Sequence, residues 1–328
     1  MTDNYKDIAD RKRQLMKIFL LFWILVNISI FAVKAQQDPQ FSQNRFNQLT
    51  VNPGFAGSTG LINVSLLNRF QWLGFPGAPV TTVFNADATV HLIGNEDGIG
   101  FSVMNDVIGF EKNVSVGLNY SWRTQLGNGK LGSGISVGLM NKNLNLDMTG
   151  IDGSDLVNLS DPGLPQGKVG GVVADFGLGL FYQHKDYELS FSAKHINQPT
   201  LFFGQAGKYS ILRHYYLSGN YTIQMADERL QAIPSIFLKS DATTWQADIN
   251  MTLQYDKRFW GGLGYRIGDA IIVTAGTELW NGIKFGYSYD VSISSLSRYN
   301  AGSHEFFLSY SVLLYKKKIH KYKSVRFL

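Results

Sequence analysis

The feature that most constrains this chain is a two-residue alternation of apolar and polar side chains that recurs along most of its length. From Trp245 to Tyr255 every odd position is apolar, and polar residues fill the even positions between them. Successive side chains of a β-strand point to opposite faces, so this pattern predicts a strand with one apolar and one polar face. Its length matches the roughly 9–11 residues with which a tilted strand crosses a membrane.

The same pattern predicts about fourteen strands, and an even number is the rule for bacterial barrels made of one chain. A soluble β-sandwich also alternates, but its strands are usually only about 5–6 residues long. Aromatic side chains also fall at the expected strand ends, where a barrel carries its interfacial girdles. The predicted fold class is therefore all-β, a transmembrane antiparallel β-barrel. We expect its strands at 61–72, 80–91, 98–105, 112–126, 130–145, 171–184, 186–195, 211–225, 229–239, 243–255, 258–267, 270–279, 282–292 and 303–315.

The lengths of the links between these strands predict how the barrel is oriented. If the first strand starts in the periplasm, every second link should be a short turn. The links in those positions are short and polar or glycine-containing, as at 127–129, 226–228 and 256–257. The long links all fall in the other set: 73–79, 146–170, 196–210 and 293–302. We therefore expect an outer-membrane location, with both termini in the periplasm and the long loops outside the cell.

The first 35 residues predict a signal peptide. Basic residues at 11–13 and 17 precede an apolar run from 18 to 33, and small residues occupy Val33 and Ala35, the −3 and −1 positions of a cleavage site. A membrane anchor helix is the alternative, but the run is shorter than the roughly 20 residues that a span needs. We expect cleavage after Ala35.

The net charge of +5 is a property of the two ends of the chain. Residues 1–35 carry +3 and residues 316–328 carry +6, which leaves about −4 for the body. The basic balance therefore does not indicate a nucleic-acid-binding face. The basic tail at 316–328 is either a solvated periplasmic extension that meets anionic headgroups or a contact for an acidic periplasmic protein.

No residue pattern indicates catalysis, a metal or a cofactor. The six histidines show no HxH or HExxH spacing, and the chain has no cysteine. The Gly-x-Gly pairs at 98–100, 132–134 and 177–179 do not extend into phosphate-binding motifs and are typical of a barrel wall. In the cluster at 303–305, His304 and its neighbours should point to opposite faces. We predict that the chain is not an enzyme and has no cofactor, no metal site and no nucleic-acid partner.

The segment at 36–60 has a different composition from the strands. It is rich in Asn and Gln, with phenylalanines interspersed and a turn signal at Asn52-Pro53-Gly54. It predicts either a plug folded into the barrel or across its periplasmic mouth, or a docking segment for a periplasmic partner. Its candidate partner-binding residues are Asp38, Pro39, Phe41, Ser42, Gln43, Asn47, Asn52 and Pro53.

The first outer loop is the second region that differs from the wall. It holds two prolines and two glycines beside Trp72 and Phe75. It predicts either a packed hairpin loop or a surface for a secreted protein. Its candidate partner-binding residues are Gln71, Trp72, Gly74, Phe75, Gly77 and Pro79.

These two regions also carry a family resemblance. Between residues 37 and 110 the chain reads QDPQFSQ, VNPGFAGS, RFQWLGFPGAP and GIGFSVMNDVIG, in that order. This resembles the PorP/SprF family of type IX secretion membrane proteins in the Bacteroidetes, whose pattern runs close to QDPxFSQ, NPAxAGS, RxQWxGFxGAP and GxGxSxxNDxIG. Gly54 stands where the family favours Ala. The dense match covers about a third of the chain.

The resemblance implies an outer-membrane component that anchors the type IX machinery or helps to secrete or attach surface proteins such as gliding adhesins. The partners it implies are the periplasmic ring proteins and a secreted surface protein recognised through its C-terminal domain, in addition to outer-membrane lipids. The alternative is a passive porin or small-solute transporter with an open lumen. The expected organisation is a signal peptide at 1–35, a periplasmic or plug segment at 36–60, a barrel at 61–315 and a basic periplasmic tail at 316–328.

Overall fold

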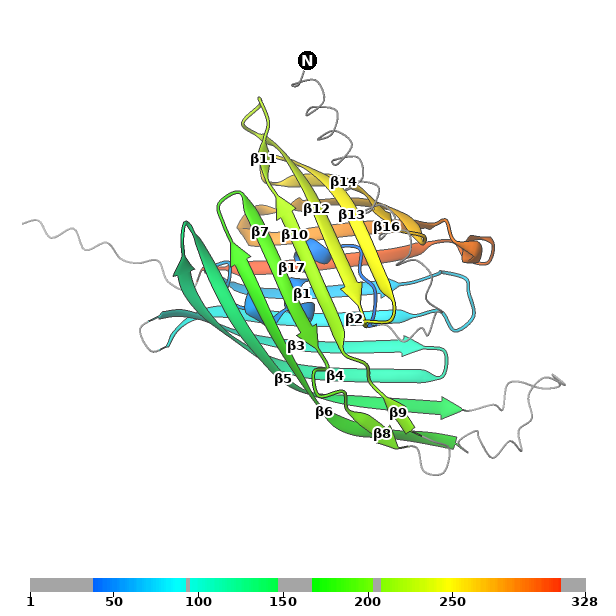
Figure 1. Ribbon diagram of the computed structural model, residues 1–328. Helices are drawn as coiled ribbons and strands as arrows, with labels where there is room; N and C mark the ends of the chain where they lie inside the picture. The colour runs from blue at the N-terminus through cyan, green and yellow to red at the C-terminus, as the bar shows by residue number, and fades with distance from the viewer. Residues whose placement is uncertain (1–37, 93–94, 147–166, 203–207, 314–328) are drawn as a thin grey trace, which may run out of the picture. The chain divides into compact units, whose positions relative to one another are not determined.

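The computed structural model describes residues 38–92, 95–146, 167–202 and 208–313, which belong to one compact unit. Fourteen antiparallel strands pair with their chain neighbours, and pairing of β1 with β17 and of β10 with β12 closes the barrel (Figure 1). The strands of the barrel are β1 (Ile62–Phe70), β2 (Val80–Leu92), β3 (Asn95–Ile108), β4 (Glu111–Leu126), β5 (Gly129–Leu146), β6 (Gly167–Gln183), β7 (Tyr187–Lys194), β10 (His214–Tyr221), β12 (Leu230–Ser240), β13 (Trp245–Tyr255), β14 (Phe259–Arg266), β15 (Ala270–Glu278), β16 (Ile283–Ser292) and β17 (Ser303–Val312).

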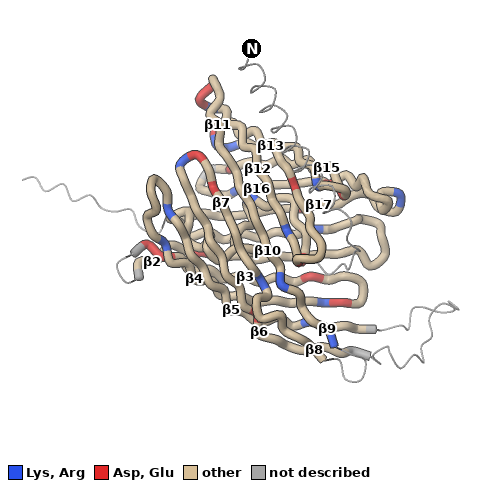
Figure 2. Tube along the Cα trace, in the orientation of Figure 1, with Lys and Arg blue, Asp and Glu red and all other residues tan. Residues whose placement is uncertain are grey.

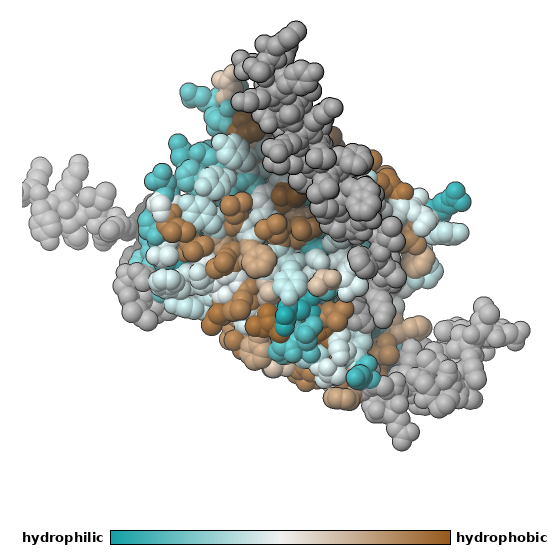
Figure 3. Space-filling view, in the orientation of Figure 1, coloured by the Kyte–Doolittle hydropathy of each residue, from teal (hydrophilic) through white to brown (hydrophobic). Residues whose placement is uncertain are grey.

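The prediction of a closed barrel of about fourteen strands is confirmed, and each expected strand corresponds to one observed strand. The alternation has the expected consequence, because apolar side chains such as Leu118 and Leu263 are more than 60% exposed on the outer wall. Figure 3 shows apolar residues gathered over the facing strands, and Figure 2 shows long stretches of strand without charge. A lipid-facing wall accounts for so much exposed apolar surface.

Smaller elements complete the described chain. The N-terminal segment, which we define as residues 38–61, forms three short turns before the first strand. A separate hairpin lies between β7 and β10 and has contacts with β6. These elements are η1 (Asn44–Phe46), α2 (Gln48–Val51), η2 (Pro53–Phe55), β8 (Thr200–Phe202), β9 (Lys208–Ser210), β11 (Ile223–Gln224), η4 (Trp280–Gly282) and η5 (Ser295–Arg298). Within the described ranges, no helix has the length and apolar character needed to cross a membrane.

The two mouths of the barrel differ in the length of their connections. One mouth, the short-turn mouth, has tight links such as 127–128 and 256–258. The other, the long-loop mouth, has the connections at 71–79, 195–213 and 293–302. The predicted alternation of short and long links is thus present in the described chain, and the link at 147–166 lies outside it.

The N-terminal segment runs back through the barrel from one mouth to the other. Asp38 contacts His195 and His214 at the long-loop mouth, whereas Gly57 is close to the short-turn mouth, near the start of β1. The segment's turns appear in blue inside the ring of strands (Figure 1). The described chain therefore starts at the long-loop mouth and ends, at Leu313, at the short-turn mouth.

The prediction that both termini lie at one mouth stays a prediction, because residues 1–37 and 314–328 are outside the described chain. An even number of strands places only the start of β1 and the end of β17 at the same mouth. It says nothing of a segment without strands that precedes β1, and residues 38–61 use this freedom to cross the lumen. The predicted signal peptide at 1–35 and the basic tail at 316–328 lie outside the described residues.

Leu263 provides a test of the lipid-facing wall. It lies in the middle of β14 with its side chain 63% exposed. An arginine near the bilayer midplane costs about 2–4 kcal/mol. We expect Leu263→Arg to lower the free energy of unfolding from lipid vesicles by about that amount. Leu73→Arg, in a loop at the long-loop mouth, should change it by less than about 1 kcal/mol, and equal effects of the two substitutions would argue against this placement of the wall.

Candidate functional site

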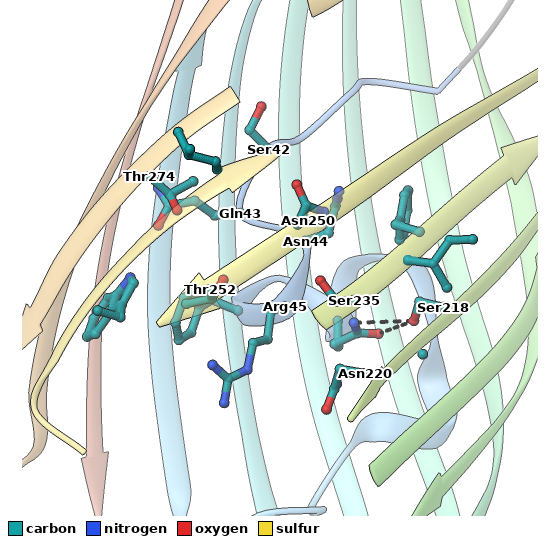
Figure 4. A pocket seen from close by; sticks show the side chains of 17 residues that line it. Ser42, Gln43, Asn44, Arg45, Ser218, Asn220, Ser235, Asn250, Thr252 and Thr274 are labelled. Atoms are coloured by element: carbon teal, nitrogen blue, oxygen red, sulfur yellow. Dashed lines mark hydrogen bonds between the residues drawn. The ribbon is translucent and has the colours of Figure 1, made fainter. Parts of the chain in front are cut away.

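The candidate site is the lumen, where the N-terminal segment packs against inward side chains of the wall. Eleven strands of the barrel form hydrogen bonds with this segment, and β3 and β5 pack closely against it. Figure 4 shows part of the arrangement, with Asn44 and Arg45 of the segment facing Ser218, Asn250 and Thr252 of the wall. The segment is rich in amides because its short turns leave backbone and side-chain groups that the wall must satisfy.

Ser42 is the centre of a buried network of charges near the long-loop mouth. Its hydroxyl donates to Asp290 at 2.7 Å and accepts from Arg69 at 2.9 Å and from Arg266 at 3.1 Å. Its backbone N–H and that of Gln43 donate to the two carboxylate oxygens of Glu305, each at 2.8 Å. The five charged residues of this Ser42 network, each less than 2% exposed, are Arg69, Asp248, Arg266, Asp290 and Glu305.

Every charge in the Ser42 network has a partner of opposite sign. Arg69 contacts Asp290 at 2.7 Å and Glu305 at 3.1 Å. Arg266 contacts Asp248 at 3.0 Å and Asp290 at 2.8 Å, and it also donates to the carbonyl oxygen of Phe41. Removing one partner of a buried ion pair costs about 3–5 kcal/mol, because the other charge is left uncompensated. These ion pairs join strands of the wall to one another, and Phe41, Ser42 and Gln43 of the segment add hydrogen bonds to them.

Apolar packing holds the next part of the segment. Phe41 lies in a buried cluster with four side chains of the wall, and the ring of Phe46 stacks on Phe307 with centroids 5.2 Å apart. The other members of the cluster are Leu67, Val83, Met104 and Phe307. These wall residues point inward, so the lumen is apolar where the segment brings aromatic rings to it.

Amide side chains hold the segment in the middle of the lumen. Asn52 is fully buried and donates to Ser190 and to the carbonyl oxygen of Leu180, at 2.7 and 2.8 Å. Its own carbonyl oxygen accepts from the backbone N–H of Gly54, so the side chain also closes the turn at Pro53. Asn47 accepts from Asn85 of β2 at 3.0 Å.

Glycines of the wall make room for the segment. A Cβ atom on Gly98 would overlap the backbone of Ala56, one on Gly134 that of Gly54, and one on Gly179 the side chain of Asn52. These glycines belong to the Gly-x-Gly pairs that the sequence analysis assigned to the barrel wall. The close approach of the segment explains why glycine is needed there. Glycine is used where another backbone approaches closely.

A second polar cluster holds the start of the segment. The Asp38 carboxylate accepts from Tyr216 at 2.5 Å and contacts His195 Nε2 at 3.1 Å. Burial alone would raise the pKa of Asp38, but the charges of His195 and Lys194 outweigh it and hold that pKa well below its usual range. Burial lowers the pKa of His195, and the carboxylates of Asp38 and Asp175 outweigh it and raise that pKa to about 9. In this state the imidazolium bridges two carboxylates.

Small cavities lie beside the packed segment. Two cavities lined by inward residues of the wall and by the segment are each about 50 Å³ in volume. A cavity of that size holds a few water molecules. Arg45 and Asn220 line the first cavity, which is the one drawn in Figure 4.

The structure places the two sets of sequence-predicted residues differently. The eight candidates of the N-terminal segment are all in the lumen, and six of them, from Phe41 to Pro53, are buried. This burial favours the plug over the docking segment. The six candidates of the first outer loop remain at the long-loop mouth, where Gly74, Phe75 and Gly77 are exposed.

The first outer loop is ordered by backbone hydrogen bonds to its neighbours. Trp72 donates its N–H to the Ser303 hydroxyl at 3.1 Å, and Leu73 exchanges two hydrogen bonds with the backbone at 301–302. Gly77 accepts from the N–H of Gly109. Trp72 has a φ of 51°, a left-handed conformation that is costly for a bulky side chain and needs such support. The loop therefore presents its exposed residues on a fixed backbone.

Sequence reasoning missed several residues of the site. The sequence alone did not single out Arg69, His195 or His214. It indicated Glu305 only as a neighbour of His304 in the cluster at 303–305. The observed strand alternation turns Glu305 inward and leaves His304 to bond Tyr287 at 2.8 Å. The detectable signal was a charge on the inward face of a strand, which a lumen must pair. Their partners lie far away in sequence and could not be assigned.

The fold and the lumen define a class of protein: a membrane β-barrel whose interior is occupied by its own N-terminal segment. The chain belongs to the family described as "Type IX secretion system membrane protein PorP/SprF", whose profile matches residues 33–310. The resemblance seen in the sequence is thereby confirmed, and the barrel is an outer-membrane one. This is a family of secretion membrane proteins and not of enzymes. A comparison with curated proteins found no match.

Solved structures with similar architecture are outer-membrane barrels. The Ralstonia pickettii toluene transporter TbuX is 11% identical, with 80% of this chain and 92% of that chain covered and a TM-score of 0.46. Acinetobacter baumannii Omp33 is 6% identical, with 77% and 97% covered and a TM-score of 0.44. KdgM porin is 10% identical, with 76% and 98% covered and a TM-score of 0.37. We draw nothing about function from likenesses this distant.

The fit between segment and wall can be tested at two inward-facing glycines. A methyl group on Gly98 meets the backbone of Ala56, whereas one on Gly117 meets no atom within 4 Å. We expect Gly98→Ala to lower the free energy of unfolding by about 1–3 kcal/mol through overpacking. Gly117→Ala should change it by no more than about 0.5 kcal/mol. Trypsin should also cleave after Arg45 faster in Gly98→Ala, and identical behaviour of the two variants would contradict the packing described.

Proposed function

We propose that this chain is an outer-membrane component of the type IX secretion system that anchors the machinery or helps to secrete and attach specific surface proteins, such as gliding adhesins. The observation that carries the proposal is the filled lumen, with residues 38–57 packed against the wall and cavities of about 50 Å³ beside them. The alternative, a passive porin or small-solute transporter, needs a continuous water-filled path. Because the segment fills the lumen, the two mouths and the outer wall are the surfaces that remain available for binding partners.

In this proposal the long-loop mouth faces the outside and the short-turn mouth faces the periplasm. Long extracellular loops and short periplasmic turns are the usual arrangement of outer-membrane barrels. The periplasmic ring proteins would then meet the short-turn mouth, and the basic tail at 316–328 would emerge beside them. The secreted surface protein, recognised through its C-terminal domain, would meet the long-loop mouth.

The absence of cysteine makes this orientation easy to test. Tyr299 is 68% exposed in the long connection at 293–302, and Glu228 is exposed in a short turn. A membrane-impermeant maleimide should label Tyr299→Cys on intact cells and Glu228→Cys only after the outer membrane is opened. The reverse pattern would invert the barrel and remove this part of the proposal.

The first outer loop is the proposed contact for the secreted protein. Leu73 is 46% and Phe75 is 40% exposed, although this loop lies beyond the strands that form the lipid-facing wall. Exposed apolar side chains on an ordered backbone are typical of a binding surface, because little conformational entropy is lost when the partner docks. We propose that the eight candidate residues of the N-terminal segment hold that segment in the lumen, because a partner could reach the six buried ones only if the segment left the lumen.

The proposed contact predicts a specific loss of partner. A tagged barrel should co-purify with a surface protein and with components of the secretion machinery. The double substitution Leu73→Ser with Phe75→Ser should lower recovery of the surface protein about tenfold or more, because central apolar contacts carry most binding energy. Phe202→Ser is the matched control, since Phe202 is 75% exposed on a different connection at the same mouth.

Recovery of the surface protein unchanged by the loop substitutions would remove the loop from the proposal. Normal secretion and surface attachment in a strain that lacks this chain, with no co-purifying partner, would overturn the proposed function itself.

A further inference from the structure

The cluster around Asp38 contains more donor groups than an ion pair needs. Asp38, His195 and His214 each offer one ligand atom, and these atoms lie within 4.8 Å of one another. They come from three segments: the start of the N-terminal segment, the residue after β7 and the first residue of β10. His195 is fully buried and His214 is 3% exposed, so both rings are held in place.

The Nδ1 atom of each imidazole faces a hydrogen-bond acceptor, which fixes the orientation of the ring. His195 Nδ1 lies 2.7 Å from the Asp175 carboxylate, and His214 Nδ1 lies 3.0 Å from the carbonyl oxygen of Leu212. Both partners can only accept, so each Nδ1 carries a hydrogen. His214 Nε2 accepts the backbone N–H of Asp38 at 3.2 Å, and the protonated Nε2 of His195 donates to the Asp38 carboxylate. A carboxylate or backbone carbonyl on the far nitrogen is the arrangement that orients metal-binding histidines in proteins.

The Asp38 carboxylate leaves one oxygen for such an ion. Tyr216 and Lys194 both contact Oδ2, at 2.5 and 3.6 Å. Oδ1 lies 3.1 Å from His195 Nε2. The His195 backbone has a φ of 54°, a left-handed conformation in which the chain bends to bring the ring inward. Strained backbone of this kind clusters at binding sites.

We propose that Asp38 Oδ1, His195 Nε2 and His214 Nε2 bind one divalent transition-metal ion, best matched by Zn²⁺, which pins the start of the N-terminal segment to the wall. Two imidazoles and a carboxylate, with water in a fourth position, are an established donor set for zinc. When the ion binds, it takes the place of the proton on His195 Nε2, and that proton is released to solvent. It also replaces the hydrogen bond from the backbone N–H of Asp38 to His214 Nε2, and that N–H turns to solvent. This site is independent of the proposed secretion role.

The charges around the cluster are compatible with a divalent ion. Lys194 and Lys239 oppose it, but Lys239 is directed at the backbone carbonyl of Asp38, at 2.8 Å, and not at its carboxylate. Asp175 and Asp241 add negative charge near the two histidines. The side chains of Asp38 and Asp175 are about 15% exposed, so an ion can enter from the long-loop mouth. The motif search found no such site because its ligands are 19 and 157 residues apart.

The test is calorimetric titration of the purified, metal-stripped full mature chain in detergent with Zn²⁺ alone. The wild type should bind one ion, and His195→Ala and His214→Ala should each lose that binding. Asp175→Asn should weaken it about 10–100-fold, as expected for a residue that orients a ligand. His184→Ala is the matched control, because His184 also lies near a carboxylate, that of Asp186, but at the other mouth. It should leave the binding unchanged.

X-ray absorption on the zinc-loaded wild type tests the same site without any substitution, and so covers the case in which a histidine variant does not fold. It should report two imidazole nitrogens and at least one further light ligand. The proposal is overturned if the wild type binds no zinc, if binding survives in the His195→Ala and His214→Ala double variant, or if the spectrum contains no imidazole. Loss of binding in His184→Ala would also overturn it, because the ion would then lie elsewhere.

Discussion

The interaction on which the rest of the structure depends is the pairing of buried wall charges with the backbone and hydroxyl of Ser42. Arg69, Arg266 and Asp290 come from three strands and meet on one hydroxyl group. Glu305 accepts two backbone N–H groups that only the N-terminal segment supplies. An empty lumen would leave these groups to water, whereas the filled lumen pairs them in a dry site, where each pair is worth more. Wall and segment are therefore parts of one interior.

The glycines and amides of this chain follow from the same constraint. A segment without strand pairing must satisfy its backbone with side chains, and Asn52 does so for both segment and wall. Such a segment also needs space, which Gly98, Gly134 and Gly179 provide by lacking side chains where its backbone passes. A simple solute channel would tolerate larger side chains at these three positions. Here such side chains would displace the segment. In the function we propose, this interior suits a platform for partners more than a conduit.

Much of the fold was predictable because strand alternation is local. The run from Trp245 to Tyr255 identifies a strand without knowledge of its neighbours, and link lengths then separate the two mouths. The path of residues 38–61 was not predictable, since nothing in their composition states a direction. The site was only half predictable. Ser42 and Asn52 stood out as part of an unusual segment, but Arg69 contacts Asp290 and His214 contacts Asp38, and each of these partners is more than a hundred residues away.

The central claim is that the N-terminal segment fills the lumen and blocks it to ions. Single-channel recording in planar bilayers tests this claim most directly. The wild-type chain should insert without producing conductance steps. A variant that keeps residues 1–37 but lacks residues 38–57 should produce them, because a fourteen-stranded barrel without its filling is wide enough for water and ions. Steady conductance of the wild type, equal to that of the deletion variant, would contradict the account.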